Sequence, residues 1–156
     1  MTAPVPISCL YFGKLTVIFF VALITQGWVG ILYLIAGKLA GLPGLCPAEV
    51  LFWLLRGTLA AIAVGALQLL LSMFIRSFSI PIGIALAGGV IGMLISNEGF
   101  GIYWPYSLVL MGMNSNKSAD VLSGNSLLFV LSAVLYFLLF YLIAVRILKT
   151  RDIRTM

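Results

Sequence analysis

The chain has 156 residues, of which 63% are hydrophobic and 8% are charged, and its mean hydropathy is +1.22. A soluble domain carries about a quarter charged residues, so this composition leaves no room for a separate soluble domain. The net charge of +5 does not indicate nucleic-acid binding, because the basic residues lie at the ends of apolar runs rather than in one cluster.

Four apolar runs cover most of the chain, at residues 15–36, 51–75, 80–96 and 127–145. A helix that crosses the hydrocarbon core of a bilayer needs about 17–25 predominantly apolar residues, and each run meets that length. The sequence therefore predicts an all-α, polytopic membrane helix bundle with four transmembrane helices. We expect residues 1–156 to form one membrane-embedded unit.

The distribution of basic residues predicts the orientation. If the amino end is cytoplasmic, the same side receives Lys14, Arg76, Arg146, Lys149, Arg151 and Arg154. The opposite side receives Lys38 and Lys117, together with Glu49, Glu98 and Asp120. The positive-inside rule thus favours an N-in, C-in topology. Cys9 and Cys46 then lie on opposite sides, which excludes a disulfide between them.

The first run contains Gln26 and Trp28, and the position of Trp28 nearer mid-span than the interface predicts that it packs against other helices. The second run contains Arg56 about two turns from its start, at a depth where a charge is costly. One interpretation is that Arg56 extends to the headgroups or pairs with Glu49. The other is that it lines a pathway.

Small residues recur at four-residue spacing in two of the runs. Gly57, Ala61 and Gly65 share one face of the second predicted helix, and Gly88 and Gly92 share one face of the third. Such faces let helix backbones approach closely in lipid. We expect ordinary packing within the bundle, and a homodimer seam is the alternative.

The second and third helices are antiparallel neighbours, because the link at 75–79 is very short. The aromatic residues of 102–106 follow the third helix and are typical of side chains that anchor at the headgroup level. We expect a short interfacial helix at 105–113. A polar turn at 114–125 then leads into the last helix.

The sequence offers little for catalysis. It has no histidine, which removes the usual haem ligands and histidine-based acid–base relays, and no P-loop motif. We expect no enzyme activity, metal or cofactor. Gln26, Gln68 and Ser72 are polar groups within the spans. They are expected to form hydrogen bonds between helices, and the alternative is a polar stripe that lines a translocation path with Arg56.

Several short stretches carry a family resemblance. Pro6-Ile7-Ser8 is followed by Phe12-Gly13-Lys14, and further stretches lie at 67–72, 78–84, 104–107 and 151–153. In their order and spacing they resemble the permease subunits of ABC-2 type exporters, more narrowly the lantibiotic-immunity (bacteriocin self-protection) group. The resemblance extends over nearly the whole chain.

The resemblance implies a six-span permease, of which this chain would match the third to sixth spans. The implied partners are a separate ABC ATPase subunit and a second permease subunit or a missing N-terminal half. The implied activity is ATP-driven export of peptide antimicrobials such as lantibiotics, and the implied location is the bacterial cytoplasmic (plasma) membrane. The alternatives are a non-transporting structural or regulatory membrane protein and, less favoured by the residues, a membrane enzyme that acts on lipid.

Overall fold

The computed structural model describes residues 7–41, 48–115, 120–122 and 124–152. The helices are α1 (Ile7–Leu39), α2 (Ala48–Phe74), α3 (Ser79–Asn97), the 3-10 helix η1 (Gly101–Tyr103), α4 (Ser107–Gly112) and α5 (Ser126–Asp152). No strand occurs in these residues. The predicted all-α class is confirmed.

Four helices are long and apolar enough to cross a membrane, over Tyr11–Leu39, Ala48–Phe74, Ser79–Asn97 and Ser126–Leu148. These spans contain the four predicted apolar runs almost completely, which confirms a multi-pass membrane bundle. The N-in, C-in orientation stays a prediction, as does the identity of the membrane.

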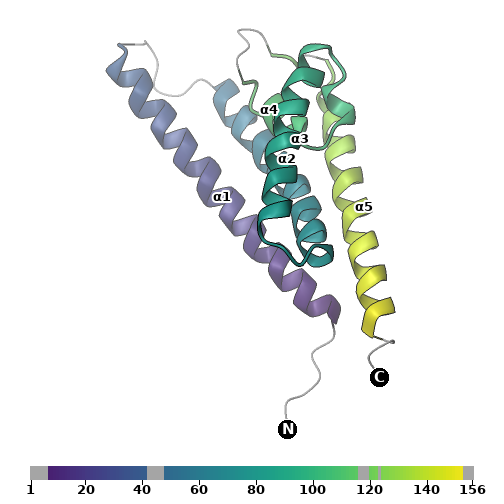
Figure 1. Cartoon of the computed structure of the whole chain (residues 1–156). Coiled ribbons are helices and arrows are strands. Elements are labelled where there is room, and N and C mark those ends of the chain that lie inside the picture. Colours follow the sequence, from purple (N-terminus) through teal and green to yellow (C-terminus); the bar gives the residue numbers. More distant parts are fainter. Residues whose placement is uncertain (1–6, 42–47, 116–119, 123, 153–156) are drawn as a thin grey trace.

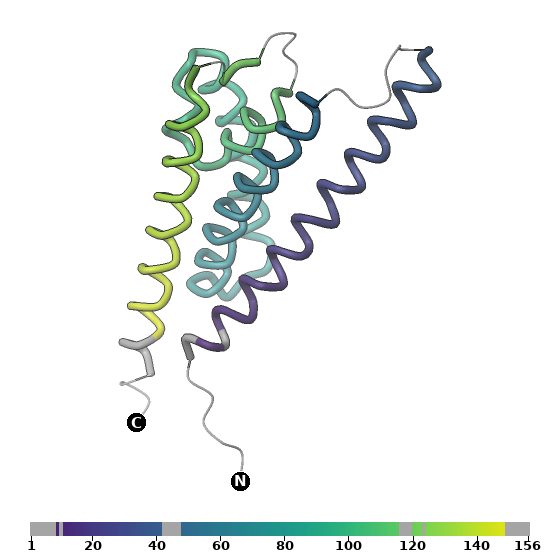
Figure 2. The backbone as a smooth tube through the Cα atoms, turned by 180° about the vertical axis from the view of Figure 1, so that it is seen from behind, coloured from purple at the N-terminus to yellow at the C-terminus, as the bar shows by residue number. Residues whose placement is uncertain are grey.

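α2 is the central helix of the bundle, and α1, α3, α4 and α5 all pack against it. Figures 1 and 2 show α1 leaning away from the other helices toward its C-terminal end. Trp28 lies on this helix and is 61% exposed, so the prediction that it packs inside the bundle is wrong. The physical reason is that α1 has few neighbours near Trp28: in this half of the helix only Ala22, Gln26 and Gly30 are buried against the bundle.

The buried side chains form two clusters along α2. One cluster joins α1, α2 and α5 near the start of α1, through Tyr11, Leu15, Ala66, Leu70, Phe140 and Ala144. The other joins α2, α4 and α5 through Ala60, Leu108, Met111, Leu122, Phe129 and Ala133. Ala60, Ala63 and Ala66 of α2 are almost fully buried because small side chains let the neighbouring helices approach the central one.

Residues 100–114, here named the re-entrant segment, turn back into the bundle after α3 instead of lying on the surface. The segment contains η1 and α4, and it contacts α3 and α2. Its aromatic residues reach Gly88, which lies nine residues before the end of α3 and hence about 13 Å along the helix. The predicted short helix exists as α4, but the prediction that this segment is interfacial is wrong.

Candidate functional site: the re-entrant segment

Two glycines of α3 receive the aromatic side chains of the re-entrant segment. The indole nitrogen of Trp104 donates a hydrogen bond of 2.9 Å to the carbonyl oxygen of Gly88. A Cβ atom at Gly88 would lie 2.5 Å from Cδ2 of Tyr106, and one at Gly92 would lie 3.0 Å from the backbone nitrogen of Ser107. The small face predicted from the sequence is therefore the surface on which this segment docks.

Tyr106 also connects the segment to α2. The side-chain nitrogen of Gln68 donates a hydrogen bond of 2.7 Å to the Tyr106 hydroxyl oxygen. This bond joins two helical elements, as expected for Gln68. Ser72, one turn further on, instead donates to the carbonyl oxygen of Leu69 in its own helix, at 2.8 Å, so it does not form the predicted bond between helices.

Side-chain hydroxyls bind backbone carbonyls in the non-helical part of the segment. The Ser107 hydroxyl lies within hydrogen-bonding distance of the carbonyl oxygens of Gly101 and Trp104. Tyr136 of α5 donates a hydrogen bond of 2.7 Å to the carbonyl oxygen of Tyr103. Irregular backbone at membrane depth is tolerated where it is buried in protein and its polar groups are paired. These hydroxyls supply that pairing.

α4 lies backbone to backbone on α2. A Cβ atom at Gly112 would lie 3.0 Å from the carbonyl carbon and oxygen of Arg56 and 3.1 Å from the nitrogen of Gly57. A Cβ at Gly57 would in turn lie 2.8 Å from Cγ of Met113. Gly57 and Gly112 thus form a close contact between the two helices, whereas Gly65 of the same α2 face packs against Ile18 of α1.

Arg56 pairs with Asp120, which precedes α5. Its Nη1 atom lies 3.0 Å from both carboxylate oxygens, and its Nη2 donates a hydrogen bond of 2.9 Å to the Ser126 hydroxyl. The side chains of Arg56 and Asp120 are only 18% and 32% exposed. The predicted pairing with Glu49 is wrong, because the chain after α4 folds over the first turns of α2 and supplies a nearer carboxylate.

Gln26 faces α2 from α1 and is 9% exposed. Its Oε1 atom is buried without a hydrogen-bond partner among the described residues. A Cβ at Gly57 would lie 3.0 Å from its Nε2 atom. Gln26 borders a cavity of about 290 Å³ together with Thr25 and Ala61. The amide is therefore a buried polar group at the interface between α1 and α2.

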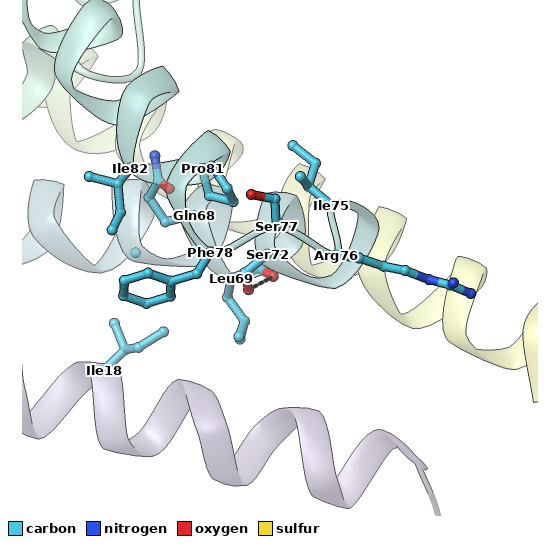
Figure 3. A pocket seen from close by; sticks show the side chains of 11 residues that line it. Ile18, Gln68, Leu69, Ser72, Ile75, Arg76, Ser77, Phe78, Pro81 and Ile82 are labelled. Atoms are coloured by element: carbon cyan, nitrogen blue, oxygen red, sulfur yellow. Dashed lines mark hydrogen bonds between the residues drawn. The ribbon is translucent and has the colours of Figure 1, made fainter.

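The four residues proposed from the sequence as a polar path do not converge. Gln68 and Ser72 border a groove of about 540 Å³ near the link between α2 and α3 (Figure 3). Gln26 borders a different cavity, and Arg56 is held in its ion pair. Arg56 and Gln68 are twelve residues apart on α2, which corresponds to about 18 Å. In this conformation the described residues do not form one polar path.

Trp104, Tyr106 and Asp120 were not predicted to bind other residues inside the bundle. Trp104 bonds to Gly88, Tyr106 to Gln68, and Asp120 to Arg56. Two signals were available for them. The glycine pair on α3 indicates a close approach by another element, and an arginine at membrane depth requires a nearby acceptor. Neither signal identifies the partner, because the partners are distant in the chain.

Removing the Tyr106 hydroxyl tests the link between the segment and α2. Tyr106→Phe keeps the ring against Gly88 and deletes the acceptor of the Gln68 bond. We expect the free energy of unfolding to fall by about 0.6 kcal/mol, the average for side-chain hydrogen bonds between membrane helices, and by no more than the maximum of about 1.7 kcal/mol. Unfolding by SDS in mixed micelles, followed by circular dichroism, measures this loss. Tyr33→Phe, on an exposed part of α1, is the matched control and should change nothing.

Gln26 offers a prediction of the opposite sign. Gln26→Met keeps the shape of the side chain and removes the buried oxygen that has no partner. Because an unpaired buried polar atom costs about 1–3 kcal/mol, we expect the variant to be more stable by about 1 kcal/mol in the same unfolding assay. Thr25→Val is the control, since the Thr25 hydroxyl already bonds to the Val21 carbonyl at 2.8 Å. A destabilised Gln26→Met would show that the amide has a partner in the membrane.

The described residues contain no group of three or more His, Cys, Asp or Glu side chains that could hold a metal ion. The contacts fix the position of the re-entrant segment. Its aromatic rings pack on α3, and the Gln68 amide bonds it to α2. The ion pair of Arg56 with Asp120 joins α2 to the residues before α5. Comparisons with protein-family models, curated proteins and solved structures found no match to this chain.

Proposed function

We propose that the chain is a membrane-spanning permease subunit of an ATP-driven exporter for peptide antimicrobials such as lantibiotics. The observation that carries the proposal is the re-entrant segment, which brings irregular backbone and the short helix α4 against the middle of α3 and α2. Non-helical backbone occurs at membrane depth where it is buried in protein or lines a water-filled cavity, and in many transporters such broken helices form the substrate site. The motif resemblance of the sequence to ABC-2 type permeases supports the same function.

In this proposal the chain supplies movement rather than bond chemistry. The first half of α1 is anchored to α2 and α5 through Tyr11 and Leu15, whereas its C-terminal part leans away from the other helices (Figure 1). In the proposal this C-terminal part is the one that moves against α2. The re-entrant segment is braced on α2 and α3 and moves with them. ATP binding and hydrolysis occur on a separate ATPase subunit, and a second permease chain or an N-terminal half completes the path across the bacterial plasma membrane.

The experiment that tests the proposal is native mass spectrometry of the tagged chain, purified from its own membranes in mild detergent. We expect a complex that contains a P-loop ATPase and a further permease chain. The measurement is paired with the tolerance of the cells to lantibiotics, for the wild type and for Gly88→Leu, which blocks docking of Tyr106. Gly89→Leu is the control, because nothing lies within 4 Å of a Cβ at Gly89.

We expect tolerance to fall in Gly88→Leu to the level of cells that lack the chain, and to be unchanged in Gly89→Leu. A bare monomer or homo-oligomer without an ATPase, combined with equal tolerance in all strains, would contradict the exporter. That outcome would favour the structural or regulatory role.

A further inference from the structure

A groove opens between α1 and the link that joins α2 to α3, toward the end of the bundle where α1 begins (Figure 3). Its volume of about 540 Å³ lies within the range of about 300–1,000 Å³ for small-molecule sites. Its apolar walls include Ile18 of α1, Leu69 of α2 and Ile82 of α3. Figure 3 shows Phe78 and Ile18 pointing toward one another across the gap.

The polar side chains at the inner part of the groove are already engaged. Gln68 donates to Tyr106, and Ser72 donates to the carbonyl of its own helix. A peptide backbone lying there would lose its hydrogen bonds to water and find few replacements, which is costly in a membrane. A hydrocarbon chain makes no hydrogen bonds to water, so it loses none when it enters the groove. The inner part of the groove therefore suits an acyl chain.

One cationic residue, Arg76, borders the groove, and a second, Lys14, lies on α1 one helical turn from the lining residue Ile18. Arg76 lies in the link itself, is exposed, and in Figure 3 points away from the apolar walls. Lys14 precedes Ile18 on the same face of α1 and is also exposed. Lysine and arginine at such positions extend to the headgroup level. The link between α2 and α3 and the nearby turn of α1 thus each carry one positive charge at this end of the groove.

Of the four acidic residues of the chain, only Asp152, the last residue of α5, lies at this end of the bundle (Figure 1). Glu49 begins α2, Glu98 follows α3, and Asp120 precedes α5, which places all three at the opposite end of the bundle. The charge at the groove is therefore not balanced by these carboxylates. It is complementary to an anionic headgroup attached to a chain that enters the apolar part.

We propose that this groove binds one anionic phospholipid from the adjacent leaflet, with an acyl chain between Ile18, Phe78 and Ile82 and the phosphate between Lys14 and Arg76. Phe78 is 85% exposed in the protein alone and would cover the bound chain. The site is independent of the proposed export function, since it needs only the geometry of α1 and the link between α2 and α3.

The test is native mass spectrometry of the full chain, delipidated in mild detergent and titrated with equal amounts of phosphatidylglycerol and phosphatidylcholine that carry identical acyl chains. A basic side chain near a membrane surface favours an anionic lipid by about five-fold. We expect the wild type to retain phosphatidylglycerol preferentially. Lys14→Gln combined with Arg76→Gln should reduce that preference by about 25-fold. Lys38→Gln, a cation near the other end of α1, should leave it unchanged.

A second pair of variants tests the acyl-chain part. Ser72→Phe fills the groove from an exposed position and should lower retention of both lipids, whereas Leu86→Phe, at a 69% exposed position on α3, should not. Circular dichroism of each variant serves as the control that its helices are retained. An unchanged preference in the double cation variant, or wild-type retention in Ser72→Phe, would overturn the proposal. So would a dimer that Ser72→Phe dissociates, because a second copy would then occupy the groove.

Discussion

Gly112→Leu is expected to lower the free energy of unfolding by about 3 kcal/mol and to detach α4 from α2. Overpacking a tight contact costs about 1–3 kcal/mol, and occasionally more. The upper part of that range applies because the atoms nearest to a Cβ at Gly112 belong to the backbone of Arg56 and Gly57, at 3.0–3.1 Å. No flexible side chain can move aside, so the whole helix must shift.

Two measurements check this expectation. Unfolding by SDS in mixed micelles gives the stability change, and limited proteolysis reports whether residues 100–114 leave the bundle. Gly89→Leu on α3 is the matched control, because nothing lies within 4 Å of its Cβ position and leucine has the higher helix propensity. Equal stability of Gly112→Leu and the wild type, with no new cleavage, would show that α4 is not held on α2 as described.

The four spans could be predicted because the signal is local. A run long enough to cross the hydrocarbon core must pair its backbone groups internally, so length and hydrophobicity alone indicate a helix. The observed helices extend a few residues beyond the runs, as at Ser126–Leu148. The mistake at Trp28 has a different origin: depth in the membrane follows from the sequence, but the neighbours of a helix face depend on how the other helices are placed.

The re-entrant segment could not be predicted for the same reason. An aromatic cluster next to a span is usually interfacial, and residues 102–106 match that pattern. The segment enters the bundle because Gly88 and Gly92 leave space for Trp104 and Tyr106. The glycine pair and the aromatic residues were each visible in the sequence as separate features. Neither feature indicates that it contacts the other.

For Arg56 the energetic argument was right, but the predicted ion-pair partner was wrong. Its depth in α2 required an acceptor, and Glu49 lies seven residues away on the same helix. Asp120 is 64 residues away in the sequence and binds the guanidinium through both carboxylate oxygens. The partner follows from the path of the chain after α4, which local sequence patterns do not encode.

That ion pair carries the second large effect. Arg56→Gln and Asp120→Asn should each lower the free energy of unfolding by about 2 kcal/mol. The value lies between the 0–1 kcal/mol of exposed pairs and the 3–5 kcal/mol lost when one partner of a buried pair is removed, because the two side chains are 18% and 32% exposed. Each single variant leaves a partly buried charge without its counterion.

The double variant separates this contact from other losses. If the pair acts as a unit, Arg56→Gln with Asp120→Asn should be no less stable than either single variant, which gives a coupling energy of about 2 kcal/mol in a double-mutant cycle. Glu49→Gln is the control, since Glu49 is exposed in the first turn of α2 and should change stability by less than about 0.5 kcal/mol. Additive losses in the cycle would mean that Arg56 and Asp120 stabilise the fold separately. In that case the guanidinium is free to act on a ligand, and the pathway role first considered for Arg56 would regain support.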